Sequence, residues 1–291
     1  MKKVYMAPLM GTFLCWGSLY VVSKIALKTV PPVTLLALRY IVAIPVLFVI
    51  LALRGKLTRM TRKDVMTAAA IGVTGYFMSF CLQMLGISRL TGSISSLLGA
   101  MNPIFIPVLA SFYLKEELTR AKVLCVAVSM LGVVMIIGVN GTVDILGALL
   151  MLVSVFLWST TSIIIRRISG KYDPMQIAML GMVFALPLTG AWAALELKTA
   201  AFSLPLESLL AVLFMGIVGT AVAHTLWNTS LSLMDASFCS MFYPMQPLVS
   251  SVLGVLILGE TVTLNFVVGG IVICCGIVAA VRTGGKNTKR T

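Results

Sequence analysis

Long apolar runs occupy most of the chain and are separated by short segments that carry charged residues, Pro or Gly. A helix that spans a bilayer needs about 20 mostly apolar residues. Ten runs reach this length, and the segments between them are too short to hold a soluble domain. The pattern predicts an all-α integral membrane protein with transmembrane helices at 5–26, 33–53, 65–87, 91–114, 122–139, 144–166, 174–194, 206–230, 235–258 and 264–282.

The composition supports this class. Of the 291 residues, 59% are hydrophobic and 11% are charged, and the mean hydropathy is +1.07. Soluble domains average about 45–50% apolar and about 25% charged residues. A soluble fold with so few charges could not cover its surface, which argues against soluble enzymes and nucleic-acid-binding proteins. The six cysteines lie in apolar runs without the spacing of a metal site or a disulfide framework, so we expect them to pack between helices and expect no cofactor.

Positive charge is distributed unevenly over the connecting segments. If the N-terminus is cytoplasmic, 17 of the 22 Lys and Arg residues fall on the cytoplasmic side and three (Lys28, Arg89 and Lys198) on the outside. Cytoplasmic loops carry such an excess, and it accounts for the net charge of +13 without a nucleic-acid partner. Both termini are therefore predicted to be cytoplasmic. The first run is too long for a signal peptide and lacks a small-residue cleavage site, so we expect it to remain as the first helix.

The two halves of the sequence match each other at offsets of 142 and 144 residues. The matched pairs include Trp16 with Trp158, Lys24 with Arg166, Pro32 with Pro174, Gly72 with Gly216, Gly75 with Gly219, Ser93 with Ser237, Asn102-Pro103 with Gln246-Pro247, and Glu116 with Glu260. Each half holds five predicted helices, an odd number, so the halves must have opposite orientations in the membrane. Inverted repeats around a site at the membrane midplane are typical of secondary transporters. The predicted repeats are 1–141 and 142–291.

These motifs resemble the ten-helix EamA branch of the drug/metabolite transporter superfamily, over the whole chain. The resemblance rests on Trp16-Gly17-Ser18, Lys24, Pro32, Arg39, Asn102-Pro103, Leu114-Lys115-Glu116-Glu117-Leu118-Thr119, Gln246-Pro247 and Leu258-Gly259-Glu260-Thr261-Val262-Thr263. It implies an inner-membrane exporter or permease of amino acids or other small metabolites. The second half departs from the pattern, because Gly181 stands where Arg39 stands in the first half.

Interrupted helices at matching places in the two halves are the best sequence pointer to a transporter site. Pro103 and Pro107 break the fourth predicted helix, and Pro244 and Pro247 break the ninth. A proline frees the backbone carbonyl four residues before it. Asn102 and Gln246 each precede a proline of their helix near the midplane, so they are candidate substrate-binding residues. The alternative is that their amide groups only satisfy the freed carbonyls.

Further candidates surround this position in the sequence. Trp16 and Trp158 fall near the midplane instead of in the interfacial belts where Trp usually collects, so they are predicted to face a cavity, with simple packing as the alternative. Ser18, Ser96 and Thr160 could line the same path, yet small polar residues are equally expected at helix contacts.

His224 is the single histidine and lies within the eighth predicted helix. As a side chain that ordinarily titrates near neutral pH, it is the candidate proton-sensitive group, and the alternative is a histidine bonded for packing. Trp227 and Asn228 follow at three and four residues and share its helix face. Tyr243 completes the predicted substrate-binding set.

The remaining charged residues are predicted to lie near the membrane surfaces. We expect Lys24 and Arg39 to extend towards the interface, with attraction of an anionic group as the alternative. Glu116 and Glu260 are predicted to cap helices or contact basic loops. All nine acids fall in loops or at helix ends, which argues against a strongly cation-selective site and leaves no intramembrane carboxylate of the kind that proton-driven pumps usually carry.

The favoured function is a secondary transporter that exports small neutral or zwitterionic metabolites such as amino acids by alternating access. A lipid or hydrophobic-drug flippase is the alternative, and a membrane-embedded enzyme is a distant one, since one His and no mid-span acid offer little for catalysis. We expect a central cavity lined by the first, third, fourth, sixth, eighth and ninth helices, with the fifth and tenth at the periphery. The expected partners are a small-molecule substrate and the lipid bilayer of a bacterial inner membrane, and no oligomer is required.

Overall fold

A computed structural model describes residues 6–90, 92–137, 144–258 and 264–284. Within these ranges the fold is entirely helical, and the one β-type contact is an isolated bridge between Ser169 and Tyr172. Seven of the described helices are long and apolar enough to cross a membrane, and two shorter apolar helices accompany them. Glu260 and Ser93 carried sequence expectations. Glu260 lies outside the described residues, and Ser93 lies in a helix whose side chains are not described at that point.

The helical elements follow one another along the chain without intervening domains. They are α1 (Met6–Ala26), α2 (Pro32–Leu53), α3 (Arg62–Ile71), η2 (Gly72–Ser79), α4 (Phe80–Arg89), α5 (Gly92–Gly99), α6 (Asn102–Tyr113), α7 (Arg120–Ile137), α8 (Ile145–Ile168), α9 (Pro174–Glu196), α10 (Leu206–Gly216), η3 (Ile217–Val222), α11 (Ala223–Leu233), α12 (Ala236–Ser240), α13 (Met245–Leu258) and α14 (Leu264–Gly284).

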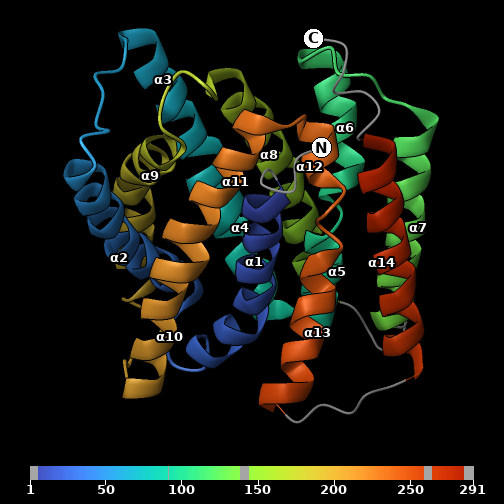
Figure 1. Cartoon of the computed structure of the whole chain (residues 1–291). Helices are drawn as coiled ribbons and strands as arrows, with labels where there is room; N and C mark the ends of the chain where they lie inside the picture. Colours follow the sequence, from blue (N-terminus) through green and yellow to red (C-terminus); the bar gives the residue numbers. More distant parts are fainter. Residues whose placement is uncertain (1–5, 91, 138–143, 259–263, 285–291) are drawn as a thin grey trace.

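The helices run back and forth between two faces of the molecule (Figure 1). We call the face at which α1 begins the Met6 face and the opposite one the Ala26 face. In Figure 1 the Met6 face is at the top, and α14 ends there too. Hydrogen bonds within the Ala26 face join the segment after α1 to the segment after α9, including one from Ser203 N to Thr29 O at 3.0 Å.

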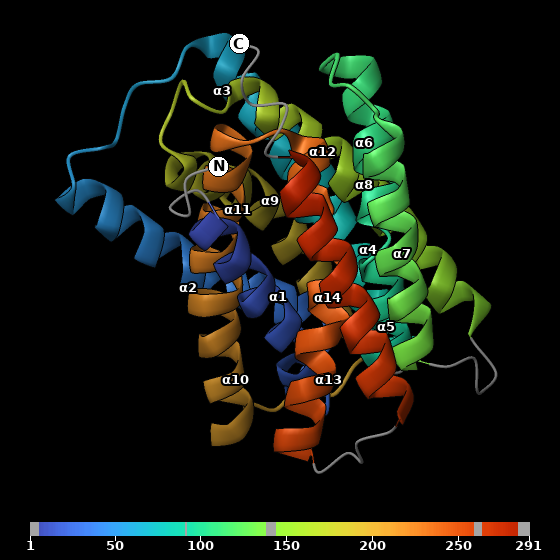
Figure 2. The ribbon, with the colours of Figure 1, turned by 45° about the vertical axis from the view of Figure 1, so that its right-hand side comes forward.

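The apolar runs expected at the periphery form α7 and α14, which pack mainly on each other and only sparsely on α5 and α13. Figures 1 and 2 both show the pair side by side at one edge of the bundle. Their backbones approach closely at Gly132, where a Cβ atom would lie 2.7 Å from the carbonyl oxygen of Gly269. Small residues permit such contacts between membrane helices, where packing replaces the hydrophobic effect as the driving force.

Two helical passes are broken at the predicted prolines. A turn at residues 100–101 separates α5 from α6, which begins at Asn102-Pro103. A second turn, at residues 241–244, separates α12 from α13, which carries Pro247 in its first turn. Both breaks are as expected, because Pro lacks the N–H needed to continue the helical hydrogen bonds.

Two further irregularities were not predicted. The segments η2 and η3 are π-helical and lie inside the passes that run from α3 to α4 and from α10 to α11. A π-helix holds an extra residue in a turn, and such segments occur frequently at functional sites. The apolar pattern of these runs does not reveal one, because inserting a residue leaves the run apolar.

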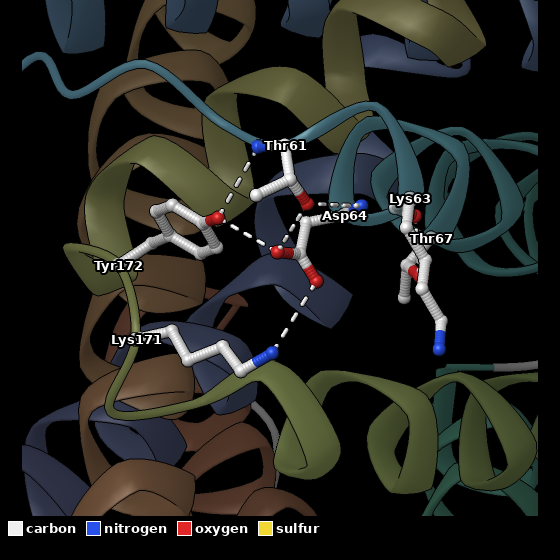
Figure 3. Close-up of polar contacts among 6 residues, drawn as sticks. All are labelled: Thr61, Lys63, Asp64, Thr67, Lys171 and Tyr172. Carbon is white, nitrogen blue, oxygen red and sulfur yellow. Dashed lines mark hydrogen bonds and ion pairs between the residues drawn. The ribbon is translucent and has the colours of Figure 1, made fainter.

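Loops of the two halves of the chain are joined on the Met6 face (Figure 3). The hydroxyl of Tyr172 donates to Asp64 Oδ2 at 2.7 Å, and Lys171 Nζ lies 3.6 Å from Oδ1 of the same carboxylate. Thr61 caps α3, since its Oγ1 accepts from Asp64 N at 3.2 Å. These bonds connect the first turn of α3 to the loop before α9.

Candidate functional site

A narrow cavity with a volume of about 40 Å³ lies at the centre of the bundle. Residues of α1, α2, α4, α5, α6, α8, α11 and α13, with the turn before α13, line it. Six predicted site residues are among them: Trp16, Asn102, Trp158, His224, Tyr243 and Gln246. The cavity extends from Trp16 towards the Ala26 face, because Ser23 and Ile87 also line it.

Aromatic rings form most of the cavity wall. Trp16 is the central ring, with centroid distances of 5.9 Å to Trp158, 5.4 Å to His224 and 6.0 Å to Tyr243. Phe80 packs against Trp158 at 4.8 Å. Most of these contacts are edge-on or tilted, the arrangement that the aromatic quadrupole favours. The two Trp residues of the sequence repeat are therefore buried together and do not face lipid.

Two hydrogen bonds link these rings to the broken ninth pass. Trp158 Nε1 donates to the hydroxyl oxygen of Tyr243 at 2.7 Å. The hydroxyl of Tyr20 donates to Gln246 Oε1 at 3.3 Å. All four side chains are buried. The turn before α13 is therefore held against α1 and α8 by side chains at the cavity wall.

Asn102 occupies the place that Pro103 leaves vacant in the backbone hydrogen bonding. Its Nδ2 donates to the carbonyl of Gly99 at 2.8 Å, which is the carbonyl four residues before Pro103. Its Oδ1 accepts from Ser159 Oγ at 3.0 Å. Gln246 behaves differently, since the carbonyl four residues before Pro247 accepts from the backbone N–H of Gln246 at 2.9 Å and its side chain bonds to Tyr20 instead.

His224 lies two residues beyond η3 and is 1% exposed. Its Nδ1 is 2.9 Å from the carbonyl oxygen of Thr220. A carbonyl only accepts, so Nδ1 carries the proton, and Nε2 has no hydrogen-bond partner among the described protein atoms. Trp227 Nε1 is likewise unpaired in the described part of the chain, while Asn228 Nδ2 donates to the carbonyl of Pro174 at 3.1 Å.

Five predicted site residues are absent from the lining of the central cavity. Trp227 and Asn228 are fully buried behind it, and Ser96 is buried in α5. Ser18 donates to the carbonyl of Cys15 at 2.7 Å, and Thr160 donates to that of Phe156 at 3.0 Å. The hydroxyl groups of these last two residues are thus bonded to their own helix.

The expectation for Arg39 was wrong. Arg39 is 2% exposed and lines the central cavity instead of reaching the membrane surface, and its Nε donates to Thr220 Oγ1 at 3.0 Å. Lys24 Nζ donates to the carbonyls of Ile87 at 2.8 Å and Leu90 at 2.7 Å, so it caps the end of α4. The last carbonyls of a helix have no hydrogen-bond partner within the helix, and they attract a nearby positive charge.

Several lining residues were not predicted, among them Tyr20, Phe80 and Gln83. Tyr20 follows Trp16 by one helical turn, a spacing that places both on one face, and this signal was available in the sequence. A Cβ atom at Gly99 would lie 2.0 Å from the Tyr20 hydroxyl, so the small residue there makes room for the ring. Phe80 and Gln83 follow η2, whose effect on the helix face the sequence does not show.

The family model for the EamA-like transporter family matches the chain twice, over residues 4–138 and 145–282. The chain belongs to the EamA-like transporter family. It is accordingly a multi-pass membrane transporter, as the resemblance in the sequence implied.

Relatives of this EamA-family chain are named as transporters. An uncharacterized transporter of Archaeoglobus fulgidus is 28% identical and covers 97% of this chain and 99% of its own. A probable amino-acid metabolite efflux pump of Salmonella typhimurium is 24% identical, with 90% and 89% covered. An S-adenosylmethionine/S-adenosylhomocysteine transporter of Chlamydia trachomatis is 22% identical, with 90% and 85% covered. One solved crystal structure has a TM-score of 0.82 at 19% identity, covers 99% of this chain and 100% of its own, and shows the same fold.

Proposed function

We propose that this EamA-family protein is a secondary transporter that exports small neutral or zwitterionic metabolites, such as amino acids, across a bacterial inner membrane. The observation that carries the proposal is the central cavity at the two helix breaks, lined by aromatic rings, amides and Arg39. No Asp or Glu is among the described residues that line it. The relative named as an amino-acid metabolite efflux pump supports the direction and the substrate class.

The proposed topology has ten spans, arranged as inverted five-helix repeats over 1–141 and 142–291, with both termini in the cytoplasm. The order of the elements supports it, because α3-η2-α4 and α10-η3-α11 occupy corresponding positions in the two halves, as do the broken passes α5-α6 and α12-α13. The two matches of the family model, 4–138 and 145–282, agree with two repeats. Both halves lie in one chain, so transport requires no partner subunit.

Alternating access requires that one face is closed while the other is open. At the Met6 face, the carboxylate of Glu116 accepts hydrogen bonds from the N–H of Ala236 at 3.0 Å and of Ser237 at 3.0 Å. It also accepts from Ser237 Oγ at 2.6 Å. This cap joins the segment after α6 to the start of α12. It closes the Met6 face, whereas the cavity extends towards the Ala26 face. With the proposed topology, we infer that this state is closed towards the cytoplasm and gives access from the outside.

The decisive experiment is transport in liposomes that contain the purified protein. Vesicles loaded with unlabelled amino acids should accumulate the matching labelled amino acid by exchange, whereas vesicles loaded with fluorescent hydrophobic dyes or labelled lipids should not exchange them. Exchange of dyes or lipids without exchange of amino acids would reject the proposal in favour of a flippase. Metabolite profiling of the medium of overexpressing cells then tests the direction, since an importer would deplete the exchanged metabolite.

A further inference from the structure

A buried guanidinium group stands at the cavity wall with most of its hydrogen-bonding capacity unused. Arg39 is 2% exposed, and its one hydrogen bond in the described part of the chain runs from Nε to Thr220 Oγ1. The hydroxyl of Thr220 in turn donates to the carbonyl of Met215 at 2.7 Å, which fixes the oxygen that holds Nε. An arginine carries five N–H donors. The four on the two Nη nitrogens therefore have no protein acceptor among the described residues.

The positive charge of Arg39 also has no counter-ion among the described residues. The ion pairs among the described residues are Lys56–Asp173, Arg89–Asp144 and Lys171–Asp64, and all three lie near the two faces of the molecule. Glu196, on the Ala26 face, is bonded to the first turn of α2 through Thr34 N at 2.7 Å. Arginine stays protonated in proteins, and an unpaired buried charge is strongly unfavourable. A site with this charge is ready for an anionic group from outside the protein.

The shape of the group specifies which anion fits. The two Nη nitrogens and Nε form a planar fork that matches the two oxygens of a carboxylate, or of a phosphate, through parallel hydrogen bonds. Trp16, Trp158 and Tyr243 line the same cavity, and the faces of such rings attract ammonium groups. One arginine with several aromatic rings and no acid thus suits a molecule that carries a carboxylate and an ammonium group together.

We propose that Arg39 binds the carboxylate of a zwitterionic, amino-acid-like substrate in the central cavity. This inference rests on the proposed function and names the group of the substrate that the cavity recognises. Thr220 is the positioning residue, because its hydroxyl holds Nε and leaves the Nη nitrogens for the ligand.

The two halves of the chain differ at the position of Arg39, so the cavity holds one arginine and not a symmetric pair. The repeat places Gly181 opposite Arg39 and Tyr76 opposite Thr220. A Cβ atom at Gly181 would lie 2.6 Å from the ring of Tyr76. Arg39 therefore meets the smaller Thr220, whereas Gly181 meets the larger Tyr76. The tyrosine fills the space at one contact that the arginine fills at the other. The substrate carboxylate is therefore bound off the symmetry axis, against α2.

The test compares matched ligands on the wild-type protein. Three of the four Trp residues, Trp16, Trp158 and Trp227, are buried at or behind the cavity, so intrinsic fluorescence of the protein in liposomes reports binding. Leucine, phenylalanine and threonine are each titrated together with the corresponding carboxamide and with the amine that lacks the carboxyl group. Loss of a charge-assisted pair should weaken binding of the carboxamide and the amine roughly 10- to 150-fold.

Variants assign the effect to the residue. Arg39→Met should abolish the preference for the amino acid over its carboxamide, and Arg39→Lys should keep part of it because the charge remains without the fork. Thr220→Val should reduce the preference, whereas Thr220→Ser should retain it. Arg89→Gln is the matched control, since it removes a positive charge from an exposed ion pair at the Ala26 face and should change nothing.

The outcomes separate this inference from the proposed function. Equal binding of an amino acid and its carboxamide by the wild-type protein overturns the role of Arg39 and leaves amino-acid transport standing, even if Arg39→Met fails to fold. If no amino acid binds or exchanges, the proposed substrate class is wrong. Acetate and inorganic phosphate are then titrated, and a fluorescence change that disappears in Arg39→Met and is reduced in Arg39→Lys supports an oxyanion site, while no change in the wild-type protein rejects one.

Discussion

At the scale of single residues, the two amides that match across the repeat do different work. Asn102 supplies the N–H that Pro103 lacks and bonds to the carbonyl of Gly99. The carbonyl freed by Pro247 is satisfied by backbone instead, and Gln246 directs its side chain to Tyr20 at the cavity. Equivalent positions in a repeat therefore do not guarantee equivalent roles, because the neighbours of each amide differ.

We expect Asn102→Ala and Gln246→Ala to have separable effects. Asn102→Ala leaves a buried carbonyl unpaired and should lower the free energy of unfolding by about 1–3 kcal/mol. Gln246→Ala should weaken substrate affinity roughly 5- to 150-fold while the melting temperature in detergent changes little. Thermal unfolding and transport KM are measured for both variants. A lowered melting temperature with unchanged KM for Gln246→Ala would make that residue structural as well.

At the scale of elements, the π-helical segments η2 and η3 stand at matched positions and bring α-helices into close contact. A Cβ atom at Gly75 of η2 would lie 2.4 Å from Thr161 Cγ2 of α8, and one at Gly219 of η3 would lie 2.1 Å from Leu19 Cδ2 of α1. Each segment thus packs its backbone onto a helix that carries one of the two central tryptophans.

Gly75→Ala should therefore destabilise the protein by about 1–3 kcal/mol, because the added methyl group overpacks the contact with α8. Gly190→Ala in α9 is the matched control, since nothing lies within 4 Å of its added Cβ atom and Ala favours the helix. The melting temperatures of both variants in detergent are compared with the wild type. Equal stability of the two variants would show that η2 is not tightly packed against α8.

Basic side chains cap matching helix ends on opposite faces. Lys24 donates to the carbonyls at the end of α4 on the Ala26 face, and Arg166 Nη1 donates to the carbonyl of Leu231 at 2.7 Å at the end of α11. These two residues match in the sequence repeat. Lys24 thus ties α1 to α4, and Arg166 ties α8 to α11. We expect each of these two pairs of helices to move as one body when access changes.

We expect the contact between Glu116 and the start of α12 to control access from the Met6 face. Cys239, which follows the capped start of α12, is fully buried. Glu116→Gln should weaken the cap and expose Cys239, so that its reaction with a maleimide becomes several-fold faster. The rate is measured with the other five cysteines replaced by alanine, and Glu117→Gln serves as the control because no bond from its carboxylate to α12 is found in the described residues. An unchanged rate would exclude Glu116 as a gate.

At the scale of the whole molecule, the bundle consists of a central cluster around Trp16 and a peripheral pair formed by α7 and α14. The pair contacts the broken passes through α5 and α13. No described residue of the pair lines the central cavity.

The proposed orientation predicts where reporter fusions will be found. Fusions after Leu57 and after Lys171 should report the cytoplasm, because both follow segments on the Met6 face, where the positive charge gathers. A fusion after Gly141, which lies outside the described residues, should report the outer side. An alkaline phosphatase reporter and a fluorescent protein give opposite signals at each position. A cytoplasmic signal after Gly141 would reject the topology.

Much of the candidate site could be predicted from the sequence. Pro103 and Pro247, in the first turns of α6 and α13, located both helix breaks, since their effect depends on a missing N–H and hardly on the surroundings. Trp16 and Trp158 were placed at the cavity from their depth and their match. The position of Arg39 was not predicted, because extension to the interface is the cheapest conformation for an isolated helix. Its burial depends on the hydrogen bond to Thr220, a residue far away in the chain that only the fold brings close.

The sequence by itself determined the helical class, the membrane setting and the two matching halves, because these follow from the length of the apolar runs and from the spacing of Trp, Gly and Pro. The tertiary structure alone decided which polar side chains meet. The partners of Asn102 and Gln246, the burial of Arg39, and the cap of Glu116 on α12 all join residues that are far apart in the chain or depend on local helix geometry. A pattern of apolar residues fixes which segments cross a membrane. It does not fix how each helix is rotated, and that rotation determines which groups line the cavity.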